Sequence, residues 1–170
     1  MIEKILRNYL EIKSLNELKH KKKPNDKYIV KKVSSEDFQL NKFFYKQIGK
    51  NHQWNDRLTW DDKKWIDYVS NSSVFTFVLK DCENIAGFFE LVYHKEKSEV
   101  EIAYFGLLSN YIDKKLGGYM LSEAIKTSFS FKAKRVWVHT CSLDHENALK
   151  NYQSRGMKIF KSEKLKVDIN

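Results

Sequence analysis

Two adjacent glycines, Gly117 and Gly118, mark the position in the chain where a ligand is easiest to place. They follow a polar segment, residues 109–115, and open a run at 119–125 whose apolar residues recur at intervals of three and four, which predicts a helix. A glycine turn that leads into a helix leaves backbone N–H groups free, and the helix dipole adds positive potential there. The sequence therefore predicts an anion site at this turn, best suited to phosphate groups.

Glu101 is the residue upstream of this turn that is best suited to move a proton. It lies in a β-favouring run, residues 99–107, where a carboxylate could act as a general base. Strand alternation groups it with Glu99, Ala103 and Phe105, and puts Val100, Ile102 and Tyr104 on the other face. The other interpretation is an exposed charge partner for a lysine on the neighbouring strand, residues 85–93. Glu90, on that strand, is the second candidate for the base.

A third feature is the spacing of Ala148, Tyr152 and Gly156, which follow one another at intervals of four. Glu101, in turn, lies eleven residues before Ile112, where the segment that leads into the glycine turn begins. With these spacings the chain resembles the GNAT superfamily of acyl-CoA-dependent N-acyltransferases, which has an Ala-x3-Tyr-x3-Gly helix end and a glutamate on the strand before its phosphate-binding turn. The resemblance is firm over residues 73–160 and looser over 28–70.

The family's phosphate-binding signature is Arg or Gln, two residues, Gly, one residue, then Gly or Ala. The corresponding frame here is Ile112-Asp113-Lys114-Lys115-Leu116-Gly117, in which only Gly117 fits. Ile112 cannot contact a phosphate as Arg or Gln would, and Lys115 lacks the backbone freedom of glycine. These departures keep open an alternative, a non-catalytic acyl-CoA-binding module, whereas the presence of both Glu101 and Tyr152 favours an enzyme.

The resemblance implies an N-acetyltransferase that moves an acetyl group from acetyl-CoA to a primary amine by direct attack. Glu101 would be the general base, and Tyr152 the acid that protonates the sulfur of CoA. The other interpretation of Tyr152 is a core aromatic, and a backbone N–H near residues 105–107 would stabilise the oxyanion. The cofactor-binding residues implied are Phe105, Gly106, Leu107, Lys114, Lys115, Leu116, Gly117, Gly118, His145 and Asn147.

The segment between the first two predicted helices, residues 49–60, is the expected acceptor wall. The substrate-binding residues expected are Trp54, Asp56, Arg57, Trp60 and, on a strand, His139. The indoles could pack against the acceptor, Asp56 could pair with its amine, and Arg57 could grip a carboxylate. The alternative is a loop anchored by buried indoles with an Asp56–Arg57 surface pair. No metal site is expected, because His139 and His145 lack further ligands at characteristic spacing.

These residues require a mixed α/β fold to bring them together. The patterns predict helices at 38–48, 61–69, 116–131 and 147–154, and strands at 28–33, 74–79, 85–93, 99–107, 135–140 and 157–167. Ser34 and Ser35, with Glu36 and Asp37, are the expected cap of the first helix. The order agrees with the GNAT fold, which implies a central, mostly antiparallel sheet, flanked by helices and splayed between its fourth and fifth strands.

Residues 1–26 are expected to be an N-terminal helix with a basic connector, followed by the acetyltransferase domain at 27–170. The apolar residues that repeat with helical spacing are Ile2, Ile5, Leu6, Tyr9 and Leu10. Residues 1–34 hold ten Lys or Arg and four acids, which is +6 of the net charge of +9. Lysine far outnumbers arginine, and charge is the only support for nucleic-acid binding, so the composition disfavours it as the main function.

The remaining composition indicates one packed domain in a reducing compartment. With 170 residues, 42% of them hydrophobic, the chain is long enough for a full core. Its two cysteines make no disulfide framework, and no apolar run suits a membrane span or signal peptide, so we expect a cytoplasmic location. The partners expected are a small-molecule or peptide amine acceptor and no membrane, with a homodimer left open.

Overall fold

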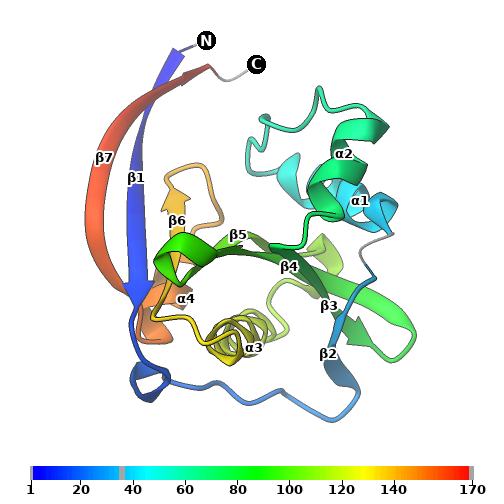
Figure 1. Ribbon diagram of the computed structural model, residues 1–170, viewed down its shortest axis with the longest axis vertical. Helices are drawn as coiled ribbons and strands as arrows, with labels where there is room; N and C mark the ends of the chain where they lie inside the picture. Colours follow the sequence, from blue (N-terminus) through cyan, green and yellow to red (C-terminus); the bar gives the residue numbers. More distant parts are fainter. Residues whose placement is uncertain (1, 35–36, 169–170) are drawn as a thin grey trace.

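The computed structural model describes residues 2–34 and 37–168. The described residues form one mixed seven-stranded sheet in the order β2-β3-β4-β5-β6-β1-β7, with helices on both of its faces (Figure 1). Two of the residues expected to cap the first helix, Ser35 and Glu36, lie outside the described residues. The helix begins after Asp37, whose carboxylate accepts a hydrogen bond of 3.3 Å from Leu40 N.

From residue 28 onward the elements agree with the sequence predictions to within two residues at each end. The strands are β2 (Tyr28–Lys32), β3 (Val74–Asp81), β4 (Asn84–His94), β5 (Glu99–Leu107), β6 (Arg135–Cys141) and β7 (Lys158–Asp168). The helices are α1 (Phe38–Gly49), α2 (Asp62–Val69), α3 (Gly117–Ser130) and α4 (Ala148–Ser154), with short 3-10 turns η1 (Leu15–Glu17), η2 (Lys95–Lys97) and η3 (Ser109–Tyr111). Among the described residues, no helix is long and apolar enough to cross a membrane.

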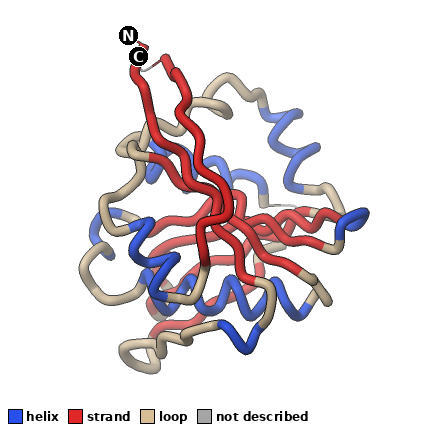
Figure 2. Tube along the Cα trace, turned by 90° about the vertical axis from the view of Figure 1, so that its left-hand side faces the viewer, coloured by secondary structure: helices blue, strands red, loops and turns tan. Residues whose placement is uncertain are grey.

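The expected N-terminal helix is wrong, because residues 2–12 form strand β1 (Ile2–Ile12). This strand lies between β6 and β7 and pairs antiparallel with both. Its buried residues near the base, Leu10 and Ile12, are two positions apart, as in a strand. The paired ends of β1 and β7 extend beyond the rest of the molecule (Figure 2). The apolar spacing is compatible with a helix, but the segment forms a strand because its backbone pairs with two strands distant in sequence.

The expected splay in the sheet is confirmed between β5 and β6. These two strands are parallel neighbours, but their pairing runs only from Glu99 with Arg135 to Glu101 with Trp137. The other strand pairs are all antiparallel. Beyond Glu101, therefore, β5 and β6 diverge and leave a gap in the middle of the sheet.

A β-bulge at Ala103 changes which face the second half of β5 presents. On β4, Leu91 is paired with Ile102 and Glu90 with Tyr104, so Ala103 is an extra residue on β5. The predicted alternation is consequently wrong beyond Ile102: Phe105 packs against the same core as Ile102, and Tyr104 packs on the opposite side of the sheet. Tyr104 thus shares a face with Glu101.

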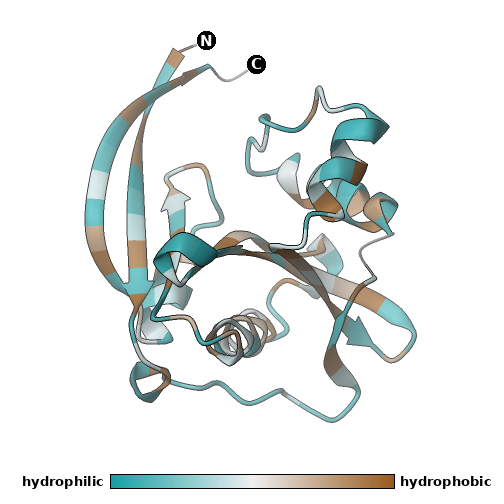
Figure 3. Cartoon of the chain, viewed as in Figure 1, coloured by the Kyte–Doolittle hydropathy of each residue, from teal (hydrophilic) through white to brown (hydrophobic). Residues whose placement is uncertain are grey.

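Helices on the two faces bury separate sets of apolar residues. On one face α3 packs on the sheet through Met120, Leu121, Ala124 and Ile125, and α4 adds Tyr152. On the other face, Phe44 and Ile48 of α1 pack on Val78 and Phe88. Apolar residues follow the central strands, whereas the connector at 13–27, below α3, is mostly hydrophilic (Figure 3).

Candidate functional site

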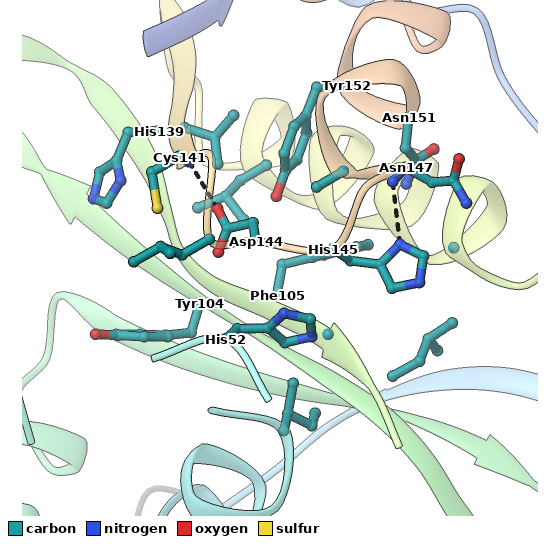
Figure 4. Close-up of a pocket in the computed structure, with 18 of the residues that line it drawn as sticks. His52, Tyr104, Phe105, His139, Cys141, Asp144, His145, Asn147, Asn151 and Tyr152 are labelled. Atoms are coloured by element: carbon teal, nitrogen blue, oxygen red, sulfur yellow. Dashed lines mark hydrogen bonds between the residues drawn. The ribbon is translucent and has the colours of Figure 1, made fainter. Parts of the chain in front are cut away.

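A cavity of about 1080 Å³ opens along the gap between β5 and β6 (Figure 4). The expected site residues that line it are Trp54, Asp56, Phe105, Gly106, Leu107, Lys115, Leu116, Gly117, Gly118, His139, His145, Asn147 and Tyr152. The described residues that line it do not include Glu101, Lys114, Arg57 or Trp60. The divergence of the two strands thus brings the predicted phosphate turn and the predicted acceptor loop into one cavity.

The start of α3 forms one end of this cavity. The first hydrogen bond of the helix runs from Met120 N to Leu116 O, so the N–H groups before it have no acceptor in the helix. Lys115, just before the helix, has a φ of 60°, in the left-handed region that glycine adopts freely. The lysine therefore adopts a backbone conformation that favours glycine, at a cost of about 1 kcal/mol.

Tyr152 projects from α4 into the cavity. Its ring is buried, with its centroid 6.3 Å from that of Phe105, and its hydroxyl points into the open space (Figure 4). Burial, with the nearby Asp144 carboxylate, raises the pKa of Tyr152 far above its ordinary value. The ring is therefore part of the core, as one interpretation expected, while the hydroxyl remains a protonated donor that faces the cavity.

Glu101 lies on β5 at the last residue pair before the gap. Its Oε2 is 3.0 Å from Nε2 of His94, at the end of β4, so its side-chain partner is a histidine rather than the lysine considered above. The Glu101 carboxylate also acts electrostatically on His139, which does line the cavity. Glu101 thus lies at the start of the gap but is not among the described residues that line the cavity.

Arg57 and Glu90 form a buried ion pair, and neither residue lines the cavity. Nη1 of Arg57 donates to both carboxylate oxygens of Glu90, at 2.9 and 3.0 Å, and both side chains are almost fully buried. The rings that face the guanidinium belong to Tyr45, Trp60, Trp65, Tyr68 and Tyr104. A grip of Arg57 on an acceptor carboxylate would require breaking this pair, and the burial of Glu90 also removes it as a second base.

Asp56 lines the cavity and is held by two tyrosines instead of by Arg57. The hydroxyl of Tyr45 donates to its Oδ1 at 2.7 Å, and that of Tyr104 lies 2.7 Å from both oxygens. Burial raises the pKa of Tyr104 and of Tyr45, so both remain protonated donors. A carboxylate fixed in this way can pair with an ammonium group.

Three histidines also line the cavity. Although His139 is exposed, desolvation lowers its pKa and the charge of Arg7 lowers it further, which favours the neutral imidazole at pH 7. The rings of His52 and His145 approach each other with their centroids 6.2 Å apart, and Nδ1 of His145 accepts a hydrogen bond from Asn147 N (Figure 4). In residues 2–34 and 37–168, no group of three or more His, Cys, Asp or Glu side chains could hold a metal ion.

Several cavity residues were missed by the sequence reasoning: Arg7, Lys21, His52, Tyr104, Asp144, Asn151 and Arg155. Arg7 was assigned to a helix and Lys21 to a solvated connector, and the bulge hides the orientation of Tyr104. For Arg7 and Lys21 the available sequence signal is the basic composition of residues 1–34.

A model of the acetyltransferase (GNAT) family matches residues 35–157. The comparison with curated proteins gives no significant match. Among solved structures, an aminoglycoside acetyltransferase from an uncultured soil metagenomic sample, in complex with trehalose, is similar with a TM-score of 0.63 and 14% identity over 75% of this chain and 86% of that one.

Two further solved structures are similar. A GCN5-related N-acetyltransferase from Sphaerobacter thermophilus has a TM-score of 0.67 and 11% identity over 95% of this chain, which spans only 50% of that one. The PaiA N-acetyltransferase from Thermoplasma acidophilum, in complex with coenzyme A, has a TM-score of 0.50 and 18% identity over 62% of this chain and 74% of that one. At these identities the likenesses show the fold, and they confirm the fold class expected from the sequence.

Proposed function

Because the chain belongs to the acetyltransferase (GNAT) family, we propose that it transfers an acetyl group from acetyl-CoA to a primary amine by direct attack. The observation that carries the proposal is the continuous cavity between β5 and β6. It joins unpaired amides at the start of α3, the hydroxyl of Tyr152 and the carboxylate of Asp56. These groups suit, in that order, a phosphate, a departing thiolate and an ammonium.

The residues present fit an acyl-CoA ligand. The phosphate end combines the amides of Gly117 and Gly118 with basic side chains, and Phe105 and Leu107 supply apolar wall. Beyond Glu101, β5 has no pairing with β6, so the gap side of residues 102–107 is free to meet a ligand through the backbone. Acetyl-CoA bound there would supply an activated thioester.

The chain's own groups can account for the proton transfers. An alkylammonium has a solution pKa near 10.4, so it must lose a proton before it attacks. Asp56 holds the ammonium, and Glu101 takes its proton through a water or through the neutral His139, since Glu101 does not itself line the cavity. Tyr152 donates its hydroxyl proton to the leaving sulfur, and a backbone N–H of residues 105–107 stabilises the oxyanion.

The acceptor belongs to the class of small amines or peptide amines. The fixed carboxylate of Asp56, with Trp54 and Tyr104 beside it, favours a cationic acceptor. One similar structure is an aminoglycoside acetyltransferase in complex with sisomicin, which makes aminoglycosides sensible members of a test panel.

The experiment that tests this function measures release of free thiol from acetyl-CoA across a panel of amines. Turnover with at least one amine, together with stabilisation of the fold by CoA, is the expected result, because a ligand that binds only the native state raises its melting temperature. Stabilisation by CoA without turnover for any amine would favour the non-catalytic acyl-CoA-binding module. No thermal shift at millimolar CoA would count against both.

A further inference from the structure

Arg155, the C-cap residue that follows α4, extends its side chain over the start of α3. A Cβ placed on Gly118 would overlap Nη1 of Arg155, so the guanidinium lies directly against the backbone of Gly118. The same Cβ would lie 3.1 and 3.3 Å from Cγ and Cβ of Lys21. Both Arg155 and Lys21 line the cavity. Two cationic side chains from distant parts of the sequence therefore meet at the helix end where the amides are free.

The guanidinium of Arg155 has no anionic partner in the described part of the chain. Its Nε is buried without a hydrogen bond there, and no carboxylate among the described residues forms an ion pair with it. Burial lowers the pKa of Arg155. A partly desolvated cation beside the positive end of a helix is unfavourable until an anion joins it.

The basic connector is held against this site by the backbone. Lys19 N donates to the carbonyl of Arg155 at 3.0 Å, and Lys21 N donates to Oγ of Ser122 on α3 at 2.9 Å. Gly156, with a φ of 100°, allows the approach, because a Cβ there would overlap the carbonyl oxygen of Glu17. The connector thus runs past the ends of α4 and α3 at a defined place (Figure 1).

We propose that Arg155, supported by Lys21, binds the pyrophosphate of acyl-CoA at the start of α3 and supplies the charge that Ile112 cannot. Ile112 lines the same cavity but carries no charge. The assignment rests on the proposed function, since it takes acyl-CoA as the ligand. It also gives a role to part of the basic segment at residues 1–34. The charge of that segment was the only sequence feature that suggested nucleic-acid binding.

The test is isothermal titration calorimetry with CoA, 3′-dephospho-CoA and pantetheine. Arg155→Ala is expected to weaken the binding of CoA and of 3′-dephospho-CoA equally, by about 10- to 100-fold, because each loses the same charge-assisted hydrogen bonds. Pantetheine, which has no pyrophosphate, should bind both proteins alike. Lys97→Ala is the control, since it removes one positive charge from an exposed residue outside the cavity and should change none of the affinities.

A second variant tests the same contact by changing Gly118 instead of Arg155. Gly118→Ala inserts a methyl group where Nη1 of Arg155 lies, so it should displace the guanidinium and weaken CoA binding in the wild-type background. In the Arg155→Ala background the overlap with Nη1 is gone and only the tight approach to Lys21 remains, so the same change should have a smaller further effect. Equal losses in both backgrounds would show that the methyl group acts on the ligand or on Lys21 and not through Arg155, and would contradict the proposal.

The outcomes separate this inference from the proposed function. If the unmodified protein binds no CoA, the proposed function fails. If it binds CoA and Arg155→Ala binds it equally well, only the role of Arg155 fails. A loss for CoA without a loss for 3′-dephospho-CoA would move the contact to the 3′-phosphate and overturn the pyrophosphate assignment. Should Arg155→Ala not fold, as judged by its thermal unfolding, Arg155→Gln, which also removes the charge, takes its place in both comparisons.

Discussion

The hydroxyl of Tyr104 lies 2.7 Å from both carboxylate oxygens of Asp56, and it joins the middle of β5 to the loop after α1. The contact exists because the bulge at Ala103 turns Tyr104 toward the face covered by α1 and α2. With Tyr45 as its second donor, Asp56 is the only acidic side chain in the loop at 49–60 and is fixed before any acceptor arrives.

Tyr104→Phe should loosen Asp56 and raise the KM for the amine acceptor by about tenfold, with a smaller effect on kcat, because a hydrogen bond to a charged group is lost. Steady-state kinetics at saturating acetyl-CoA measures both constants. Tyr93→Phe, which removes a hydroxyl outside the cavity, is the matched control and should behave as the wild type. An unchanged KM would mean that the Tyr104 hydroxyl is not needed to position Asp56 for the acceptor.

Tyr152→Phe should lower turnover by about ten- to a thousandfold and leave the affinity for CoA nearly unchanged, because the ring stays and only the donor is lost. The defect should shrink for thioesters with more acidic thiol leaving groups, which need less protonation as they depart. Turnover with a series of such thioesters checks this. An equal defect for good and poor leaving groups would leave Tyr152 as a positioning residue.

Glu101→Gln should leave CoA binding intact and reduce turnover about a hundredfold, most strongly at neutral pH, where the acceptor ammonium needs a base. The measurement is kcat/KM between pH 6 and 9. Glu99→Gln is the control, because Glu99 lies on the same strand face, is paired with Arg135 and does not line the cavity. If Glu101→Gln keeps wild-type rates throughout, the base is His139 or bulk solvent.

Lys115→Gly should stabilise the protein by about 0.5–1 kcal/mol, because glycine adopts a φ of 60° without the strain that lysine bears. Urea denaturation measures the change in the free energy of unfolding. Lys132→Gly, at a φ of 61° outside the cavity, should stabilise similarly. Only Lys115→Gly should alter the affinity for CoA. Equal affinities in the two variants would contradict a contribution of Lys115 to phosphate binding.

His139→Gln should make stability less dependent on pH on the acid side. In the folded state the pKa of His139 lies below its ordinary value of 6.5, so the unfolded chain binds the proton more tightly. Stability is therefore unaffected by this group well above pH 6.5 and is lost as the pH falls below it. The melting temperature of the wild type should fall more between pH 7 and 5 than that of the variant. Parallel curves would contradict the lowered pKa of His139 in the folded state.

The order of elements from residue 28 to 168 could be predicted from the sequence, because each one depends on local patterns. Periods of two and of three to four residues distinguish strands such as 99–107 from helices such as 117–130, and the glycines at 117 and 118 mark where the helix begins. The spacing of Glu101, Gly117 and Tyr152 could likewise be recognised, since it is a property of the sequence and needs no tertiary information.

The tertiary structure decided the features that depend on partners distant in sequence. The segment at 2–12 became a strand because β6 and β7, more than 120 residues away, pair with both of its edges. Arg57 forms its ion pair with Glu90 in the core, so Asp56 is bound by tyrosines instead. Arg155 contacts Gly118 only because α4 packs on α3. Local periodicity reports which residues are apolar, but the backbone pairing and charge compensation that fix these contacts arise only when the chain folds.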